Sequence, residues 1–169
     1  MQAIDLVIRN VRPGDLDECC AVEAYGFSPE EMASREMIRL RIETFPQGFF
    51  VAEIGERVIG MANGACTNKD DISDEKLKQL IGHDPDGRNM VIFALAVLPE
   101  FQKQDIAKQL VLRFVEEARL NKKEKVFLMC KQHLIAYYEG LVFTHMGLSR
   151  STHGGAEWHE MCLSLEETG

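Results

Sequence analysis

The sequence predicts an α/β fold, in which a central mixed β-sheet of about six to seven strands is flanked by four helices. Apolar and polar residues alternate in "IDLVIRNV", as in a half-buried strand. The uninterrupted apolar run "MVIFALAVLP" is typical of a central strand buried on both faces. In the segment after this run, apolar residues recur at helical spacing: Ile106, Ala107, Leu110, Val111, Phe114, Val115 and Ala118.

The N-terminal half is expected to form a strand, two helices and a hairpin. The first helix is predicted in "RPGDLDECCAVEAYGF" with Asp15 as its N-cap. The second is predicted in "SPEEMASREMIRLRIETFP", capped by Ser28 with Pro29 at its first position. The positions expected to face inward are Leu16, Cys19, Cys20 and Ala24 in the first helix and Met32, Met37, Leu40 and Ile42 in the second. "GFFVAEIGERVIGMANGACT" predicts a hairpin that turns at "IGER".

The C-terminal half continues the alternation of strands and helices. "NKDDISDEKLKQLIGHDPDGRN" predicts a long polar loop that carries a helical turn. "KVFLMC" predicts a short buried strand, "HLIAYYEGL" a short helix, and "FTHMGLSRSTHGGAEWHEMCLSL" two strands joined by a turn. The resulting order is β-α-α-β-β-β-α-β-α-β-β. No linker or repeat interrupts the sequence, so residues 1–169 are expected to form one domain.

Composition excludes several classes of function. The net charge is −8 and there is no stripe of basic and aromatic residues, so nucleic-acid binding is not expected. An acidic surface instead attracts cationic small molecules such as amines. No apolar stretch approaches the ~18 residues of a membrane span and the N-terminus lacks a signal-peptide pattern, so we expect no membrane partner and a cytoplasmic protein.

Cysteine and histidine spacing argues against a metal site. The five cysteines include no CxxC pair, and the five histidines form no HExxH pattern. Reduced thiols, most of them in the core, are the expected state.

The segment "LAVLPEFQKQDIAKQL" joins the central strand to a helix N-terminus. The first-turn amides of a helix are unpaired donors at the positive end of its dipole, and anions such as a pyrophosphate bind there. Lys103 and Lys108 could add positive charge. Taken alone, the segment leaves two interpretations open, a phosphate-binding loop or an ordinary connection between a strand and a helix.

The same segment resembles the cofactor motif of the GCN5-related N-acetyltransferase (GNAT) superfamily, in which a strand ending L-x-V is followed by P-x-[FY] and Q/R-x-x-G-x-G/A. The matching residues are Leu95, Val97, Pro99, Phe101, Gln102, Asp105 and Ala107, with Asp105 in place of the first glycine. "HLIAYYEGLVF" is similar to the Y-E-x-x-G-F helix end of that superfamily, with Val142 in place of the glycine. "GFFVAE", "NMVIFALAV", "LMC" and "EWHEMCLSL" resemble the arylalkylamine (serotonin) N-acetyltransferase branch.

The resemblance implies that acetyl-CoA is the cosubstrate and that a primary amine of a small molecule is the acceptor. Its implied cofactor-binding residues are Leu95, Ala96 and Val97 for the pantetheine arm and Lys103, Gln104, Asp105, Ile106, Ala107 and Lys108 for the pyrophosphate. Divergence of the central strand from "VFLMC" would open a slot for the thioester. A homodimer is a further expectation, because the last strands commonly mediate dimers in this family.

Tyr138 matches the family's tyrosine acid, which gives a proton to the departing thiolate. No general base is assigned, because Val91 and Phe93 stand where serotonin-type enzymes have two histidines. Glu53, His133 and His159 are conceivable replacements, each with a structural role as the alternative.

Cys130 lies before the tyrosine helix, but no histidine or arginine partner is visible in the sequence, so direct transfer is favoured over an acetyl-cysteine intermediate. Two alternatives to a small-molecule acetyltransferase stay open: a non-catalytic acyl-CoA-binding or sensing module, and a protein or peptide N-acetyltransferase.

Overall fold

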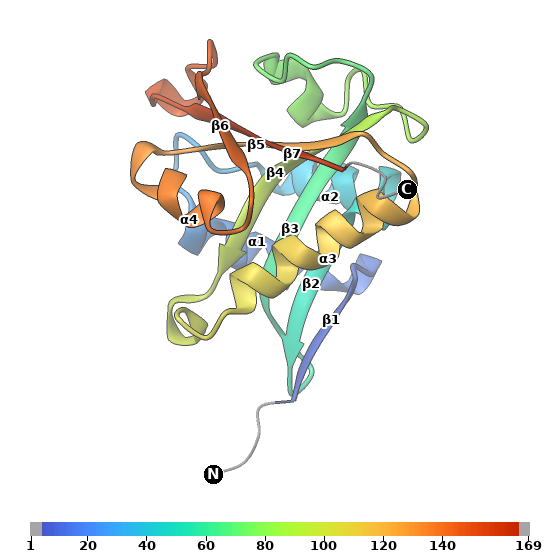
Figure 1. Cartoon of the computed structure of the whole chain (residues 1–169). Coiled ribbons are helices and arrows are strands. Elements are labelled where there is room, and N and C mark those ends of the chain that lie inside the picture. The colour runs from blue at the N-terminus through green and yellow to red at the C-terminus, as the bar shows by residue number, and fades with distance from the viewer. Residues whose placement is uncertain (1–4, 166–169) are drawn as a thin grey trace. The chain divides into compact units, whose positions relative to one another are not determined.

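Seven strands form one sheet in the order β1-β2-β3-β4-β5-β7-β6 (Figure 1). The structure is a computed structural model that describes residues 5–165. Its strands are β1 Leu6–Asn10, β2 Phe49–Ile54, β3 Arg57–Thr67, β4 Asn89–Val97, β5 Lys125–Cys130, β6 Thr144–Leu148 and β7 His159–Ser164. Its helices are α1 Leu16–Gly26, α2 Arg35–Thr44, α3 Ile106–Leu120 and α4 Ile135–Glu139. The predicted fold class and the predicted order of elements are confirmed.

The chain divides into two compact units. The first runs up to Asn63 and includes Ala94–Phe114, and the second consists of Gly64–Phe93 and the chain from Val115 onwards. Each unit has its own buried apolar side chains, so each is described by itself below.

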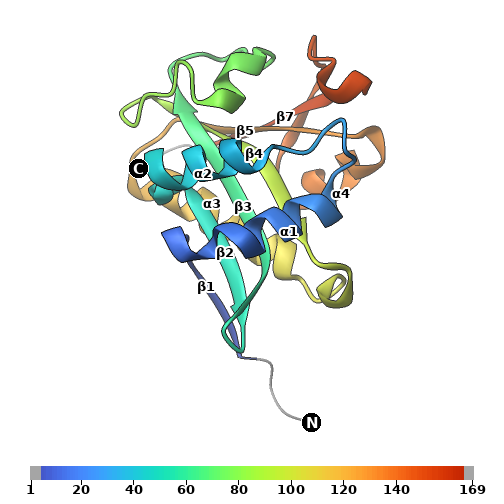
Figure 2. The same cartoon turned by 180° about the vertical axis from the view of Figure 1, so that it is seen from behind.

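In the first unit, β2 pairs antiparallel with both β1 and β3. Gly55 and Glu56 connect β2 to β3 with φ of +55° and +68°, as a two-residue hairpin turn requires, which confirms the hairpin at "IGER". Helices α1 and α2 cover one face of these strands (Figure 2), and the first half of α3 covers the other (Figure 1). On the α3 side, the rings of Phe50 and Phe114 meet edge to face at 6.2 Å between centroids.

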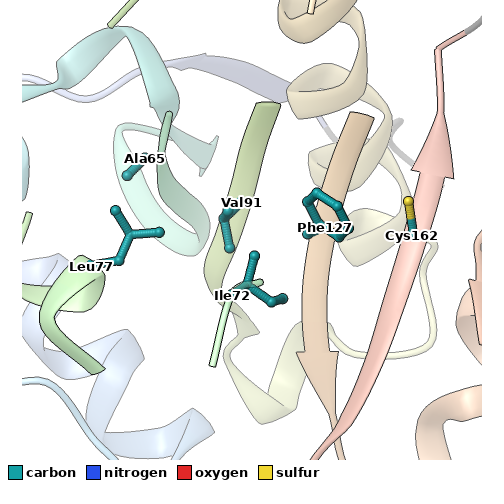
Figure 3. Packing of buried hydrophobic residues seen from close by; sticks show 6 residues of the cluster. All are labelled: Ala65, Ile72, Leu77, Val91, Phe127 and Cys162. Atoms are coloured by element: carbon teal, nitrogen blue, oxygen red, sulfur yellow. The ribbon is translucent and has the colours of Figure 1, made fainter. Parts of the chain in front are cut away.

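In the second unit, β5 lies between a parallel and an antiparallel neighbour. It pairs with the start of β4, from Asn89↔Lys125 to Ile92↔Leu128, and along its length with β7, which pairs in turn with β6. One face of these strands is closed by the loop between β3 and β4, which carries the predicted helical turn at Glu75–Gln79. Figure 3 shows the resulting cluster, in which Ile72 and Leu77 of the loop pack with Ala65, Val91, Phe127 and Cys162.

The prediction that the second helix starts after Ser28 with Pro29 in its first turn is wrong. Helix α2 begins at Arg35, and Ser34 is its N-cap, with a side-chain oxygen that accepts a hydrogen bond from the Met37 amide at 3.1 Å. Residues 28–33 form turns instead. They are held there because the Ala33 amide donates to the Glu23 carboxylate of α1 at 2.7 Å.

The inward-facing positions predicted for the two helices are also partly wrong. Cys19 and Ile42 are buried as expected, whereas Ala24, Met32 and Leu40 are exposed. The buried face of α2 consists of Ile38, Arg41 and Ile42. The Arg41 guanidinium donates to Asn63 Oδ1 at 3.1 Å, and this buried polar contact sets the helix face that an apolar pattern cannot reveal.

Asp15 precedes α1 as predicted, but its side chain does not cap the helix. Its carboxylate accepts hydrogen bonds from the Arg12 amide at 2.7 Å and from the Arg9 guanidinium at 2.8 Å. These contacts hold the pKa of Asp15 below its usual value against the opposing effect of burial.

Candidate functional site

The last three residues of β4, Leu95, Ala96 and Val97, lead directly into the predicted cofactor segment. Ala96 is packed closely from two sides within the first unit. A Cβ at Gly26, the last residue of α1, would lie 2.6 Å from the Ala96 Cβ, and a Cβ at Gly60 of β3 would lie 3.1 Å from the Ala96 carbonyl oxygen. These two glycines therefore fix the backbone of β4 at this point.

The loop of residues 98–105 is tied to the strand that it follows. The Leu98 amide donates to the Ile59 carbonyl at 2.8 Å, and Gln102 Nε2 donates to the Val97 carbonyl at 3.0 Å. A short 3-10 turn, Pro99–Phe101, lies between these contacts. Pro99, Phe101 and Gln102, which match the motif, thus form the turn that leads the chain into α3.

Two residues of this loop have left-handed backbone conformations. Lys103 has φ of +65° and Asp105 has φ of +61°. Glycine adopts this region at no steric cost, and aspartate is one of the few other residues that tolerate it. Asp105 therefore keeps the backbone shape that explains why the family motif has glycine there.

Helix α3 begins immediately after Asp105, whose carbonyl accepts the first helical bond from the Gln109 amide at 3.0 Å. The amides of Ile106, Ala107 and Lys108 belong to the first turn, which has no earlier carbonyl within the helix to bond. The side chains of Lys103, Gln104, Asp105 and Lys108 are exposed, whereas Ile106 is buried. The structure thus brings the six predicted pyrophosphate-binding residues together at one helix N-terminus.

Tyr138 lies in α4 of the second unit and is buried, with its ring against Tyr137 at 5.2 Å and against Phe143 at 6.0 Å between centroids. Burial raises the pKa of its hydroxyl above the usual value, and the neighbouring Cys130 and Tyr137 raise it further. Tyr138 therefore stays protonated at neutral pH, which is the form that a proton donor needs.

A Schellman motif follows Tyr138 at the end of α4. The Phe143 amide donates to the Tyr138 carbonyl at 3.1 Å, and the Val142 amide donates to the Glu139 carbonyl at 3.0 Å. Val142 is the residue of this motif that has a left-handed backbone conformation, with φ of +67°. As at Asp105, the chain keeps the conformation of the missing glycine.

With this geometry established, a family comparison decides the assignment. A model of the acetyltransferase (GNAT) family matches residues 16–142, which include both the 98–105 loop and Tyr138. The chain belongs to the GNAT acetyltransferase family. Acetyltransferases of this family use acyl-CoA and an acceptor substrate.

Two relatives from Bacillus subtilis (strain 168) share part of the acetyltransferase sequence. The probable hydrolase YhcX is 30% identical over 112 residues, which cover 62% of this chain and 22% of the relative. The uncharacterized N-acetyltransferase YkwB is 26% identical over 117 residues, covering 63% of this chain and 52% of the relative. The match thus spans about a fifth of one relative and about half of the other.

Solved structures share the fold over almost the whole acetyltransferase. The GphF GNAT-like decarboxylase in complex with isobutyryl-CoA has a TM-score of 0.80 and 20% identity, covering 95% of this chain and 100% of that one. YncA, a putative acetyltransferase from Salmonella typhimurium with acetyl-CoA, has a TM-score of 0.69 and 17% identity, covering 96% and 95%. Each of these two neighbours was solved with an acyl-CoA thioester bound.

The two positions where serotonin-type enzymes have histidines, and two of the three conceivable replacements, do not suit proton removal. Val91 is buried in the apolar cluster of the second unit and Phe93 packs against it. Glu53 accepts a hydrogen bond from Arg9 Nε at 2.9 Å, so its carboxylate forms an ion pair within the first unit. His133 lies exposed on the 3-10 turn Gln132–Leu134.

His159 differs from these candidates because it is buried and bonded to a second histidine. The two ring nitrogens His159 Nδ1 and His145 Nε2 lie 2.9 Å apart, between β7 and β6. His145 lies outside the motifs from which the candidate residues were predicted. The sequence carried no simple signal for the pair, because in the β6–β7 ladder His159 lies opposite Leu148 and His145 lies opposite Met161.

Cys130 ends β5 directly opposite His159. This placement supplies the histidine neighbour that the sequence did not reveal. Burial nevertheless raises the pKa of the Cys130 thiol to about 11, so it is not a thiolate at neutral pH and is poorly suited to nucleophilic catalysis.

Within residues 5–165, no three histidine, cysteine or acidic side chains are grouped so that they could hold a metal ion. No helix in the same range is long and apolar enough to cross a membrane.

Proposed function

We propose that the chain transfers the acetyl group of acetyl-CoA to a primary amine of a small molecule by direct attack of the amine on the thioester. The observation that carries this proposal is the backbone of the 98–105 loop. Lys103 and Asp105 have left-handed conformations immediately before α3, and such a conformation at Asp105 favours glycine, the residue that the family motif has at this position. Such a loop binds a diphosphate through amides, which any side chain leaves available.

In this proposal, the backbone groups of Leu95, Ala96 and Val97 pair with the pantetheine arm as a neighbouring strand would. The ladder between β4 and β5 supports this, because it pairs Asn89 to Ile92 and the later residues of β4 lie beyond its last pair. The amides from Lys103 to Lys108 hold the pyrophosphate, and the exposed ammonium groups of these two lysines add positive charge.

The chemistry requires one proton to leave the amine and one to reach the thiolate. The nitrogen lone pair attacks the thioester carbonyl carbon, the carbon–sulfur bond breaks, and Tyr138 donates its proton to the sulfur. Burial keeps the Tyr138 hydroxyl protonated at neutral pH, so its proton is present when the carbon–sulfur bond breaks. The edge-to-face contacts of Tyr138 with Tyr137 and Phe143 position its ring.

Amines of the arylalkylamine type are the first acceptors to test, because the sequence resembles that branch across most of its length.

The proposal treats residues 1–169 as one acetyltransferase domain, since the family match draws on both units. It also includes a homodimer, supported by the exposed side chains of Met146 and Leu148 on the edge strand β6. A cytoplasmic location is supported by five cysteines that form no disulfide.

The experiment incubates the full chain with acetyl-CoA and a panel of arylalkylamines, polyamines, amino acids and peptides with free N-termini, and follows the release of free thiol. Turnover of a small amine is the expected result. Turnover of peptides alone would favour a protein or peptide N-acetyltransferase. Acetyl-CoA binding without turnover of any amine would overturn the enzymatic proposal in favour of a sensing module.

Tyr138→Phe supplies the mechanistic control. It is expected to lower kcat by at least about 10²-fold, the lower end of what a general acid contributes, while acetyl-CoA binding is unchanged. The matched variant Tyr137→Phe removes an adjacent hydroxyl and is expected to leave kcat unchanged. Equal kcat values for both variants and the unmodified protein would remove Tyr138 as the acid.

A further inference from the structure

His159 and His145 form a pair that runs from the buried face of the second unit to its surface. His159 is buried, with 8% of its surface exposed, whereas His145 is exposed. The pair joins β7 to β6, and the 2.9 Å between His159 Nδ1 and His145 Nε2 is hydrogen-bond distance. A chain of two imidazoles therefore connects the interior with solvent.

The other ring nitrogen of His159 is available as an acceptor. Among the described residues, His159 Nε2 is a buried atom without a hydrogen-bond partner, since the Glu157 carboxylate lies 3.7 Å away. A neutral imidazole carries one proton. If His159 Nδ1–H donates to His145, Nε2 keeps its lone pair and can accept a proton.

His159 also lies on the same face of the second unit as the residues around Tyr138. It stands directly opposite Cys130 in the β5–β7 ladder, so both side chains project from the same side of the sheet. Helix α4, which carries Tyr138, packs against both β6 and β7. The titratable groups that the structure shows beside His159 are Cys130, Glu157 and His145.

We propose that His159 is the general base of the acetyl transfer and that His145 passes the proton from His159 to solvent. This inference rests on the proposed function, because it places the acceptor amine near Tyr138. Val91 and Phe93 leave the positions of the family's histidines without a base, and the pair supplies one from the last two strands.

Each proton that enters the relay also leaves it. As the nitrogen–carbon bond forms, the surplus proton of the acceptor nitrogen moves to His159 Nε2. The Nδ1 proton of His159 then moves to His145 Nε2, and His145 releases its own Nδ1 proton to solvent. Tyr138 separately protonates the sulfur and recovers a proton from solvent. Both histidines end as the opposite neutral tautomer and return to the first by rotation of the rings or exchange with water.

The test compares pH profiles of kcat/KM for the unmodified protein, His159→Asn, His145→Asn and the exposed control His133→Asn, with the amine found by the panel. His159→Asn is expected to lower kcat by about 10²- to 10⁴-fold and to change the pH profile of kcat/KM. His145→Asn is expected to have a smaller effect, and His133→Asn none. Acetyl-CoA affinity, measured by calorimetry, is expected to be unchanged in all three.

A second measurement does not depend on a variant that folds. Nitrogen-15 NMR of the histidine side chains in the unmodified protein is expected to show the ring proton of neutral His159 on Nδ1. A proton on Nε2, or an unchanged pH profile in folded His159→Asn, would overturn the relay while leaving the acetyltransferase proposal intact. Absence of turnover in the unmodified protein would instead overturn the proposed function itself.

Discussion

Two residues stand in backbone conformations that glycine normally occupies, and both lie in motifs of the family. Asp105 has φ of +61° at the start of α3, and Val142 has φ of +67° at the end of α4. The backbone strain differs between these two residues. Aspartate tolerates the left-handed region, whereas valine, branched at Cβ, is a true outlier there. The two positions therefore call for different experiments.

Asp105→Gly is expected to bind acetyl-CoA about fivefold more tightly. Glycine adopts the required φ without strain. The substitution also removes a carboxylate whose repulsion of a diphosphate about 4 Å away is worth ~1 kcal/mol in water. Isothermal titration calorimetry with acetyl-CoA measures the change.

Asp105→Asn separates the two causes, because asparagine tolerates the same backbone and carries no charge. If the charge dominates, the asparagine variant reproduces most of the gain. A weaker complex in Asp105→Gly would contradict the prediction and show that Asp105 mainly supports the start of α3.

Val142→Gly is expected to raise the free energy of unfolding by about 0.5–1 kcal/mol. Removing the strain of a left-handed valine gains ~1–2 kcal/mol, and the extra freedom of glycine in the unfolded chain offsets part of it. Little burial is lost, since the side chain is 72% exposed. Urea denaturation measures the difference.

Val7→Gly is the matched control for Val142→Gly. Val7 is a half-exposed valine in the strand β1, where glycine is unfavourable, so this variant is expected to be less stable than the unmodified protein. Destabilisation of both variants would mean that the Val142 side chain contributes packing that outweighs its strain.

Among the elements, the contact of α1 with β4 sets the position of the strand residues proposed to pair with the pantetheine arm. Gly26→Ala would place a Cβ 2.6 Å from the Ala96 Cβ, closer than two carbon atoms can approach. We expect a loss of about 1–3 kcal/mol in stability from this overpacking, together with weaker acetyl-CoA binding. Thermal denaturation and calorimetry measure the two effects.

Gly14→Ala is the control for Gly26→Ala, because nothing lies within 4 Å of a Cβ at Gly14. Its stability is expected to stay within about 0.5 kcal/mol of the unmodified protein. If both alanine variants behaved alike, α1 and β4 would be able to move apart, and the close contact would not control the cofactor segment.

The strands were predictable from the sequence because their signals are local. An apolar run or a two-residue turn with Gly55 determines a strand or hairpin without help from distant residues. The start of α2 was not predictable in this way. Ser28 and Ser34 both suit an N-cap, and the choice is made by Glu23 of α1, which binds the Ala33 amide.

The candidate site likewise contains residues that local motifs indicate and residues that depend on contacts between distant segments. The 98–105 loop and Tyr138 belong to contiguous motifs, so the sequence could place them. The His145–His159 pair depends on the register of two strands, which shifts at a bulge between His145 and Gly147. A one-residue error in register would put the two rings on opposite faces.

On the scale of the whole molecule, burial keeps several weak acids protonated in both units. The pKa is raised for the thiols of Cys19, Cys66, Cys130 and Cys162 and for the hydroxyl of Tyr138, in each case mainly by burial. For Cys66 and Cys130 it reaches about 11. These groups ionise at lower pH in the unfolded chain than in the folded one.

The free energy of unfolding is therefore expected to fall steeply as pH rises from about 9 to about 11. In this range the unfolded chain, whose thiols ionise near pH ~8.5, binds fewer protons than the folded protein. A raised pKa in the folded state thus stabilises below the unfolded pKa, and this stability is lost as pH rises through the folded value. Each buried thiol contributes about 1.4 kcal/mol per pH unit. Urea denaturation at pH 8, 9 and 10 under reducing conditions measures the slope.

Cys130→Ala tests whether the slope belongs to the buried thiols. The variant loses packing at every pH, which shifts the whole curve, but only the removal of a titrating group changes its slope. We expect a slope that is shallower by the contribution of one thiol, with the difference between variant and unmodified protein narrowing as pH rises. Parallel curves would show that Cys130 ionises alike in the folded and unfolded chains, and would reopen the thiolate route that its burial argues against.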